Sequence, residues 1–550
     1  MANINVNQFR QIAVWPVQLM PVRVGQVQRH WEVLDAHGAA GRWRPAPPRG
    51  IGSDNRLRED EYKEFVTFLP YVQRFLYGSA AGQESATSPA GRSIYRYERD
   101  DVRRVRVTLV AGAEPIELEV ARVELLFFLD ADIALLVFEM HAGGLPLETV
   151  QDLLFRFARA YPGFWEEDGA GGNCPHRVEL CDAQGAVLAA SDYADRDHYL
   201  GFSARHGIAP IASHWEFLLQ PLALERAGAS GALRYRQLEY YRMPLMAYLA
   251  CDDPHRLTRA QFVRLGLVTS PGGTDELPYS ASTLLDFERE YCNDTFWGRG
   301  GSHARADTRM IVTDVAMIFV GNHADRFFSH PERGLLSQFR RQYLWLFLIA
   351  HFHKAALLSM SDELAVAMDR LAVGEPESVR AFKRTIRQVM EVFLRFTHRY
   401  WFHEVSNQGV VAEVFDRLRR QLGAAELYDE VRAEVIDMNN YLDSDSFRRQ
   451  ANTVLRLTVV TIFGLVATIA TGALGMNLLD ETHTAFARRL SIFSGTVIVA
   501  LALTVFTIVR SKRLADFLDV LSDERVGWGG KWRSFTQVFA PGRRRPLSRG

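Results

Sequence analysis

The sequence has few cysteines and almost no net charge. Its 550 residues include only Cys174, Cys181, Cys251 and Cys292, too few for a disulfide scaffold, which favours a reducing compartment. The Cys174–Cys181 spacing around His176 fits no common zinc pattern, so we expect structural thiols. Lys and Arg total 64 against 65 Asp and Glu, a formal net charge of -1. No overall field attracts nucleic acid, and we expect no nucleic-acid partner.

Targeting and catalytic motifs are also absent. The first 20 residues lack a basic start followed by an apolar run, so they are not a signal peptide, and we expect the large N-terminal part in the cytoplasm. The glycine-rich segment 298–302 lacks the Lys-Ser/Thr of a phosphate-binding loop, and no second histidine follows His403-Glu404 at metalloprotease spacing. We therefore expect no enzyme and no required cofactor.

Residues 1–330 have the pattern of a mixed α/β domain. Apolar runs of strand length occupy 121–129 and 133–140, with a turn-like Asp130-Ala131-Asp132 between them. Residues 145–161 repeat apolar residues at helical spacing. Further strands are expected at 234–241, 310–313 and 316–321, and loops at 166–176 and 270–278.

Long helices are expected in the region 331–453. Residues 334–360 contain an uncharged core, 343–352, only about half the ~20 residues of a membrane span, so a buried helix is favoured there. A break at 374–378 precedes a second helix to about His403. A third helical stretch, 410–449, is charged and repeats apolar residues every three or four positions, as a stalk would.

Two uncharged runs are long enough to cross a bilayer. They are 457–479 and 490–509, joined by a loop at 480–489 within a predicted transmembrane hairpin, 454–510. Basic residues precede the first run and follow the second. This charge bias predicts a multi-pass protein of the cell membrane with both termini cytoplasmic, the tail 511–550 included.

Small and polar residues share one face of the first run. Thr461, Gly464 or Leu465, Thr468, Gly472 and Gly475 recur at steps of three or four. Such a face favours close helix packing, or it lines a pore with hydroxyls and backbone carbonyls. The spacing alone supports both interpretations.

The tripeptide Gly475-Met476-Asn477 lies at the outer end of the first run. A GMN tripeptide at the end of the penultimate span, followed by a short loop and a last span, resembles the CorA family of magnesium channels. Residues 441–458 are similar to that family's stalk-to-membrane junction, and the clear resemblance covers about 437–513.

The resemblance implies an α+β cytosolic domain, long stalk helices and a transmembrane hairpin, assembled as a homopentameric funnel in the lipid bilayer. It implies a selectivity filter of Gly475, Met476 and Asn477, with Asn477 holding the hydrated ion. The implied pore-lining residues are Asn452, Leu457, Thr461, Leu465, Thr468 and Gly472. Intracellular Mg²⁺ closes channels of this family through acidic residues, and the candidates here are Asp416, Asp429, Asp437, Asp443 and Asp445, each also readable as a solvated stalk residue.

Amide oxygens suit a hydrated divalent cation. Mg²⁺ gives up its waters reluctantly, and an asparagine ring accepts hydrogen bonds from those waters without stripping them. The resemblance implies Mg²⁺ as the transported ion, with Co²⁺ and Ni²⁺ as further substrates and Zn²⁺ as an alternative. Leu474 and Leu478 replace aromatic neighbours of GMN, and the family's acidic loop motif is missing. These departures favour a second alternative, a non-conducting membrane-anchored sensor or scaffold.

Overall fold

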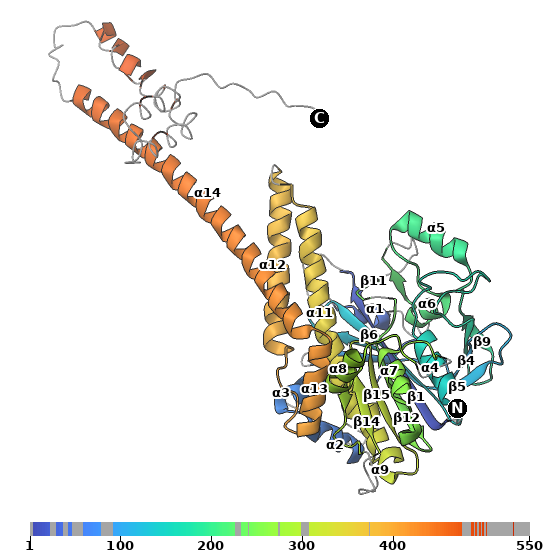
Figure 1. The fold of residues 1–550 in the computed structure, drawn as a ribbon. Helices are drawn as coiled ribbons and strands as arrows, with labels where there is room; N and C mark the ends of the chain where they lie inside the picture. Colours follow the sequence, from blue (N-terminus) through green and yellow to red (C-terminus); the bar gives the residue numbers. More distant parts are fainter. Residues whose placement is uncertain are drawn as a thin grey trace. The chain divides into compact units, whose positions relative to one another are not determined.

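The computed structural model describes residues 4–21, 29–36, 42–46, 59–78, 92–225, 233–239, 241–272, 276–298, 307–372 and 375–475, with scattered positions beyond. The chain divides into two compact units, Met1–Val435 and Ile436–Gly550. The first unit is mixed α+β, as the sequence predicts (Figure 1).

One large sheet organises the first unit. Its main path runs β13-β14-β15-β12-β1-β6-β5-β4-β8-β9, with β2, β3, β7, β10 and β11 paired off this path. The strands are β1 (Asn5–Leu19), β2 (Arg44–Pro45), β3 (Ile94–Glu98), β4 (Arg104–Thr108), β5 (Ile116–Phe128), β6 (Ile133–Ala142), β7 (Leu145–Pro146), β8 (Arg177–Cys181), β9 (Val187–Ala190), β10 (Leu222–Leu224), β11 (Leu233–Gln237), β12 (Leu245–Cys251), β13 (Cys292–Asn293), β14 (Arg309–Val312) and β15 (Ala316–Asn322).

Strand β1 lies at the centre of the sheet and pairs with several neighbours. It is antiparallel to β6 from Phe9 to Gln18 and to β12 from Val6 to Ala13, whereas β11 pairs only with Val17–Leu19. Pro16 has no N–H to donate. It falls between the residues of β1 that pair with β12 and those that pair with β11. A proline is therefore accommodated in an otherwise central strand.

Helices cover one face of this sheet over a continuous apolar core. They include α4 (Leu147–Arg156), α6 (Ser213–Leu219) and α7 (Arg259–Leu267). Phe138 of β6 packs edge-on against Trp215 of α6, with ring centroids 5.9 Å apart, and it also contacts Phe157 just beyond α4. All these rings are buried, so apolar burial holds the layer together.

The opposite face is covered by a long helix. Residues Leu335–Asp369 form α10 (Leu335–Gln338), a π-helical turn η4 (Phe339–Tyr343) and α11 (Leu344–Asp369) without a break. Phe352 stacks on Phe128 of β5 at 4.0 Å, and Phe339 contacts Phe319 of β15 at 5.5 Å. The expected buried helix at 334–360 is confirmed, and it extends to Asp369.

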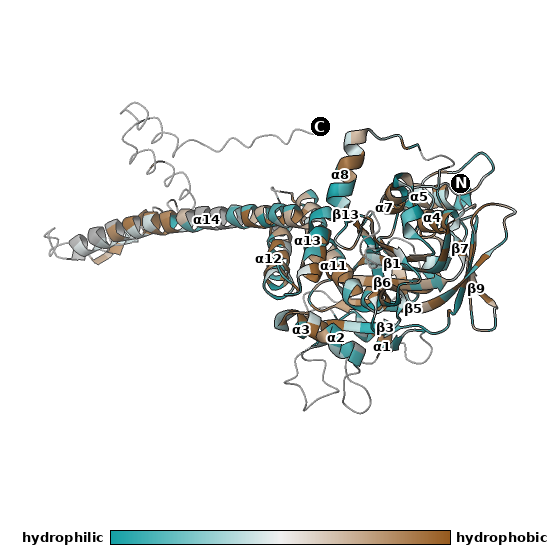
Figure 2. Cartoon of the chain, turned by 60° about the horizontal axis from the view of Figure 1, so that its bottom comes forward, coloured by the Kyte–Doolittle hydropathy of each residue, from teal (hydrophilic) through white to brown (hydrophobic). Residues whose placement is uncertain are grey.

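Further helices follow along the chain. Helix α12 (Pro376–Arg399) buries Phe382, Ile386, Val389, Phe393 and Phe396 and exposes mainly charged residues, an amphipathic pattern visible in Figure 2. Then come α13 (Gly409–Gln421) and α14 (Ala424–Gly475), which reaches into the second unit. Gly423 between them has φ 61°, a left-handed conformation that ends α13, so the expected stretch 410–449 is two helices.

The remaining helices are short. They are α1 (Trp31–Ala36), α2 (Glu59–Thr67), α3 (Pro70–Tyr77), α5 (Arg196–His206), the 3-10 turn η3 (Pro254–Arg256), α8 (Ala281–Tyr291) and α9 (Arg326–Ser329). The expected strands at 121–129, 133–140, 310–313 and 316–321 correspond to β5, β6, β14 and β15, and the helix at 145–161 to the shorter α4. The strand expected at 234–241 ends earlier, because β11 stops at Gln237. The four cysteines are buried and form no disulfide, as expected.

Candidate functional site

Helix α14 carries the residues that the sequence assigns to a pore. Its 52 residues rise about 78 Å, and the part from Leu457 to Gly475 rises about 27 Å, close to the roughly 30 Å of a hydrocarbon layer. Leu457, Thr461, Leu465, Thr468 and Gly472 follow one another at three- and four-residue steps on this helix. They therefore form one continuous stripe along it.

The threonine hydroxyls along this stripe are bonded to their own helix. Thr461 donates to the carbonyl of Leu457 at 2.8 Å, and Thr468 donates to the carbonyl of Gly464 at 2.8 Å. A hydroxyl that donates in this way keeps its oxygen lone pairs available as acceptors. Such oxygens can accept hydrogen bonds from the waters of a hydrated cation or from another helix.

The same stripe is exposed in the single chain. Leu457 is 67% exposed and Leu465 is 60% exposed. A Cβ added at Gly464 or Gly472 would meet no atom within 4 Å. Exposed leucines and open glycines leave room for another helix or for water, so both interpretations of the small-residue face stay open.

The predicted filter and the predicted second span lie largely outside the described residues. Gly475 is the last residue of α14, whereas Met476 and Asn477 are outside the description, as is the side chain of Asn452. The predicted span 490–509 and the predicted loop 480–489 are described only in part, and the described residues 486–488 of the predicted loop are helical.

The acidic candidates for regulation lie on α13 and α14. Asp416 forms an i,i+4 ion pair with Arg420 at 3.2 Å, and both side chains are largely exposed. Asp429 and Asp437 are exposed on α14, and the side chains of Asp443 and Asp445 lie outside the description. Among the described residues, no group of three or more His, Cys, Asp or Glu side chains could hold a metal ion.

Among the described residues, one helix, Leu335–Asp369, is long and apolar enough to cross a bilayer, and 83% of its most apolar window is buried within the protein. It is the core helix on the sheet. The shorter apolar segment Thr453–Ile462 belongs to α14.

A buried charge cluster joins the sheet to this core helix. Glu139 of β6 has no exposed side-chain surface and meets three arginines from three elements. Its Oε1 lies 2.9 Å from Nη1 of Arg10 and 2.6 Å from Nε of Arg340, and its Oε2 lies 3.2 Å from Nε of Arg122. Strands β1, β5 and β6 are thereby tied to η4 through one carboxylate.

The arginines determine the charge state of Glu139. Burial alone would raise its pKa, but the guanidinium groups of Arg122, Arg340 and Arg10 lower the pKa to about 2. Glu139 therefore remains ionised at neutral pH. Because a lone buried charge is costly, the cluster is stable only as a whole.

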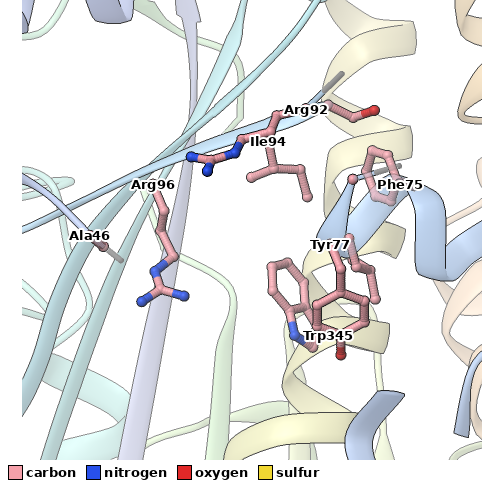
Figure 3. A pocket seen from close by; sticks show the side chains of 10 residues that line it. Ala46, Phe75, Tyr77, Arg92, Ile94, Arg96 and Trp345 are labelled. Carbon is pink, nitrogen blue, oxygen red and sulfur yellow. The ribbon is translucent and has the colours of Figure 1, made fainter. Parts of the chain in front are cut away.

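A small cavity lies between β3, α3 and α11 on this side of the sheet. Its volume is about 50 Å³, and Figure 3 shows the side chains that line it, among them Arg96, Tyr77 and Trp345. Nearby, Glu64 accepts hydrogen bonds from Tyr77 at 2.8 Å and from Trp345 at 2.7 Å. The cavity has room for a few waters and is too small for an organic ligand.

A second group of carboxylates lies where the β5–β6 turn approaches α11. Burial, followed by the charges of Asp132 and Asp362, raises the pKa of Glu363 to about 7. Burial and Asp130 raise the pKa of Asp132 to about 6. Gln18 of β1 contacts Glu363 at 3.5 Å. These carboxyls exchange protons near physiological pH.

The raised pKa of Glu363 predicts that the contribution of this carboxyl to the free energy of unfolding falls as the pH rises. The unfolded pKa of Glu363 is about 4.5 and the folded value about 7. Stability from this group is therefore full below pH 4.5 and is lost as the pH rises through 7. We expect Glu363→Gln to raise the free energy of unfolding at pH 8 by about 1–3 kcal/mol and to change little at pH 4.5. Thermal midpoints of both proteins across this range measure it.

The exposed Glu332 provides a matched control. Glu332→Gln should leave the pH profile of the midpoint unchanged. Equal midpoints for Glu363→Gln and the wild-type chain at pH 8 would contradict the raised pKa.

Sequence reasoning missed both carboxylate groups. Glu139 and Arg122 stand within the apolar runs 133–140 and 121–129, and an ionised residue inside a buried strand is the one signal that could have indicated the first cluster. Comparison of the chain with protein-family models and with curated proteins gave no match.

Proposed function

We propose that the chain is a subunit of a CorA-type channel that passes hydrated divalent cations, chiefly Mg²⁺, across the cell membrane. Five copies surround one pore, and both termini lie in the cytoplasm. The observation that carries this proposal is the GMN tripeptide that directly follows the stripe of Leu457, Thr461, Leu465, Thr468 and Gly472 on α14.

The stripe supplies the surfaces that such a pore needs. Leu457 narrows the inner end, Thr468 offers an acceptor oxygen midway, and Asn477 holds the hydrated ion at the outer end. The exposure of Leu457 and Leu465 in the single chain and the orientation of the threonine hydroxyls are consistent with these roles. Weak, water-mediated contacts let the ion leave as readily as it enters.

The membrane potential drives transport. Moving one charge through 100 mV yields roughly 2.3 kcal/mol, so a divalent ion gains about twice that amount. No nucleotide hydrolysis is required, in keeping with the lack of a phosphate-binding loop in the sequence.

Ion flux into proteoliposomes tests the proposal. Purified full-length chain is reconstituted around a Mg²⁺-sensitive dye, and uptake is followed with an inside-negative potential for Mg²⁺, Co²⁺, Ni²⁺ and Zn²⁺. We expect potential-dependent Mg²⁺ uptake above that of empty vesicles. Uptake of Zn²⁺ without uptake of Mg²⁺ would identify Zn²⁺ as the substrate. No uptake of any of the four ions would favour the sensor or scaffold, which Leu474, Leu478 and the missing loop acids also favour.

A further inference from the structure

A large open cavity in the first unit is lined by residues that belong neither to α14 nor to the two carboxylate groups. Its volume is about 910 Å³, within the range of small-molecule sites. Strands β13 and β14 at the sheet edge, helix α9, the start of the Leu335–Asp369 helix and the first turn of α13 enclose it. The first turn of α13, far along the chain from the other elements, closes the hollow.

The wall of this cavity is mainly apolar. Met310 and Val411 form buried parts of it, whereas Phe296 and Phe327 also line it and are 51% and 55% exposed. Large aromatic side chains exposed beside a hollow leave apolar surface in water, which an apolar ligand would cover.

Cationic and donor groups stand along one side of the cavity. Arg326 and Arg333 are exposed and line it together with His330. Arg333 contacts Glu59 at 3.3 Å with both side chains 66% exposed, a pair weak enough to exchange for another anion. The carboxylate in the lining, Asp325, accepts the backbone N–H of Phe327 at 2.9 Å.

His330 is oriented to donate. Its Nδ1 accepts the backbone N–H groups of Glu332 and Arg333, each at 3.2 Å. With Nδ1 as the acceptor, the ring proton of neutral His330 is on Nε2. Two guanidinium groups and one N–H donor thus lie next to an apolar hollow.

From this combination we propose that the cavity binds a small amphipathic anion, a single-chain carboxylate. The apolar chain lies against Phe296, Phe327 and Met310, and the head group pairs with Arg326 and Arg333. Guanidinium groups suit this head group because their paired N–H donors match the two oxygens of a carboxylate. The site does not depend on ion transport.

Calorimetric titration of the full-length chain in lipid nanodiscs tests the proposal. Decanoate, decylamine and inorganic phosphate are the probes, and empty nanodiscs correct for partitioning into lipid. We expect decanoate to bind saturably at one site per chain and at least about tenfold more tightly than the other two, since both the charge and the chain are recognised. Equal affinity for decylamine, equal affinity for phosphate, or no saturable binding of decanoate would overturn the proposal.

Variants locate the binding. Arg326→Ala combined with Arg333→Ala should weaken decanoate binding at least about tenfold, because charge-assisted pairs are lost. Arg289→Ala, at a 76% exposed position of α8, is the control and should bind as the wild-type chain does. Thr308→Trp should block the cavity without removing a charge. Unchanged decanoate affinity in both the double arginine variant and Thr308→Trp, with thermal midpoints preserved, would place the ligand elsewhere and contradict the proposal.

Discussion

Asn477→Ala is expected to abolish Mg²⁺ flux while leaving the channel assembled. The proposed ring of amide oxygens accepts hydrogen bonds from the waters around the ion, and alanine offers no acceptor in their place. We expect uptake into proteoliposomes to fall by at least about tenfold, because the weak binding site that admits the ion is lost.

Two further variants make this prediction specific. Asn440→Ala removes an exposed asparagine of α14 outside the predicted span and should leave uptake unchanged. Asn477→Asp replaces the amide ring with carboxylates, which should bind the ion more tightly and slow its release. Normal flux in Asn477→Ala would remove Asn477 from the filter.

Glu139→Ala is expected to destabilise the first unit strongly. The substitution leaves Arg10, Arg122 and Arg340 facing one another at the seam between the sheet and η4, with side chains 12%, 13% and 34% exposed. Removing one partner of a buried ion cluster costs about 3–5 kcal/mol. Chemical denaturation of the purified chain, followed by far-UV circular dichroism, measures the loss.

Glu119→Ala is the matched control for this change. Glu119 lies on the neighbouring strand β5, is 74% exposed and approaches His141 at 3.5 Å. An exposed pair of this kind contributes about 0–1 kcal/mol. If the two variants lost the same stability, the cluster around Glu139 would not hold the sheet to the helix.

Helices and strands whose apolar residues recur at a regular spacing, or form one short run, were predictable from the sequence. Strands β5 and β6 appeared as apolar runs around a turn, and α4 appeared as a three- and four-residue repeat. The buried helix α11 was also predictable, since its uncharged core, 343–352, is about half of the ~20 residues of a span. By length and composition the whole helix could cross a bilayer, and its burial in the protein decides between the two interpretations. These features depend on residues that are close together in the sequence, so the pattern of one sequence is enough to predict them.

Features that depend on distant residues were not predictable. Strand β1 pairs in the middle of the sheet with β6 and β12, whose partner residues lie from 115 (Gln18 with Ile133) to 245 (Val6 with Cys251) positions away. The partners of Glu139 come from β1, β5 and η4, and the cavity beside Arg326 is closed by α13. No periodicity records such long-range contacts. The break at Gly423 was missed because a glycine within a helical pattern is usually tolerated.

The candidate pore was predictable only as a stripe on one helix. Leu457, Thr461, Leu465 and Thr468 do lie along one continuous helix. In the proposed pentamer, other copies of the chain cover that stripe, and the residues of one helix do not specify how those copies meet. A stripe that packs against another helix and a stripe that lines a pore therefore consist of the same residues. The two interpretations differ only in whether water reaches those residues.

Blockage of a Thr468→Cys variant by Cd²⁺ measures that difference most directly. The four native cysteines are buried, so the introduced thiol is the reactive one. We expect external Cd²⁺ to inhibit Mg²⁺ uptake by this variant, a chelator to restore it, and the wild-type chain to be unaffected. If the variant conducts Mg²⁺ and Cd²⁺ leaves its uptake unchanged, Thr468 does not face the ion pathway, and α14 does not line the pore.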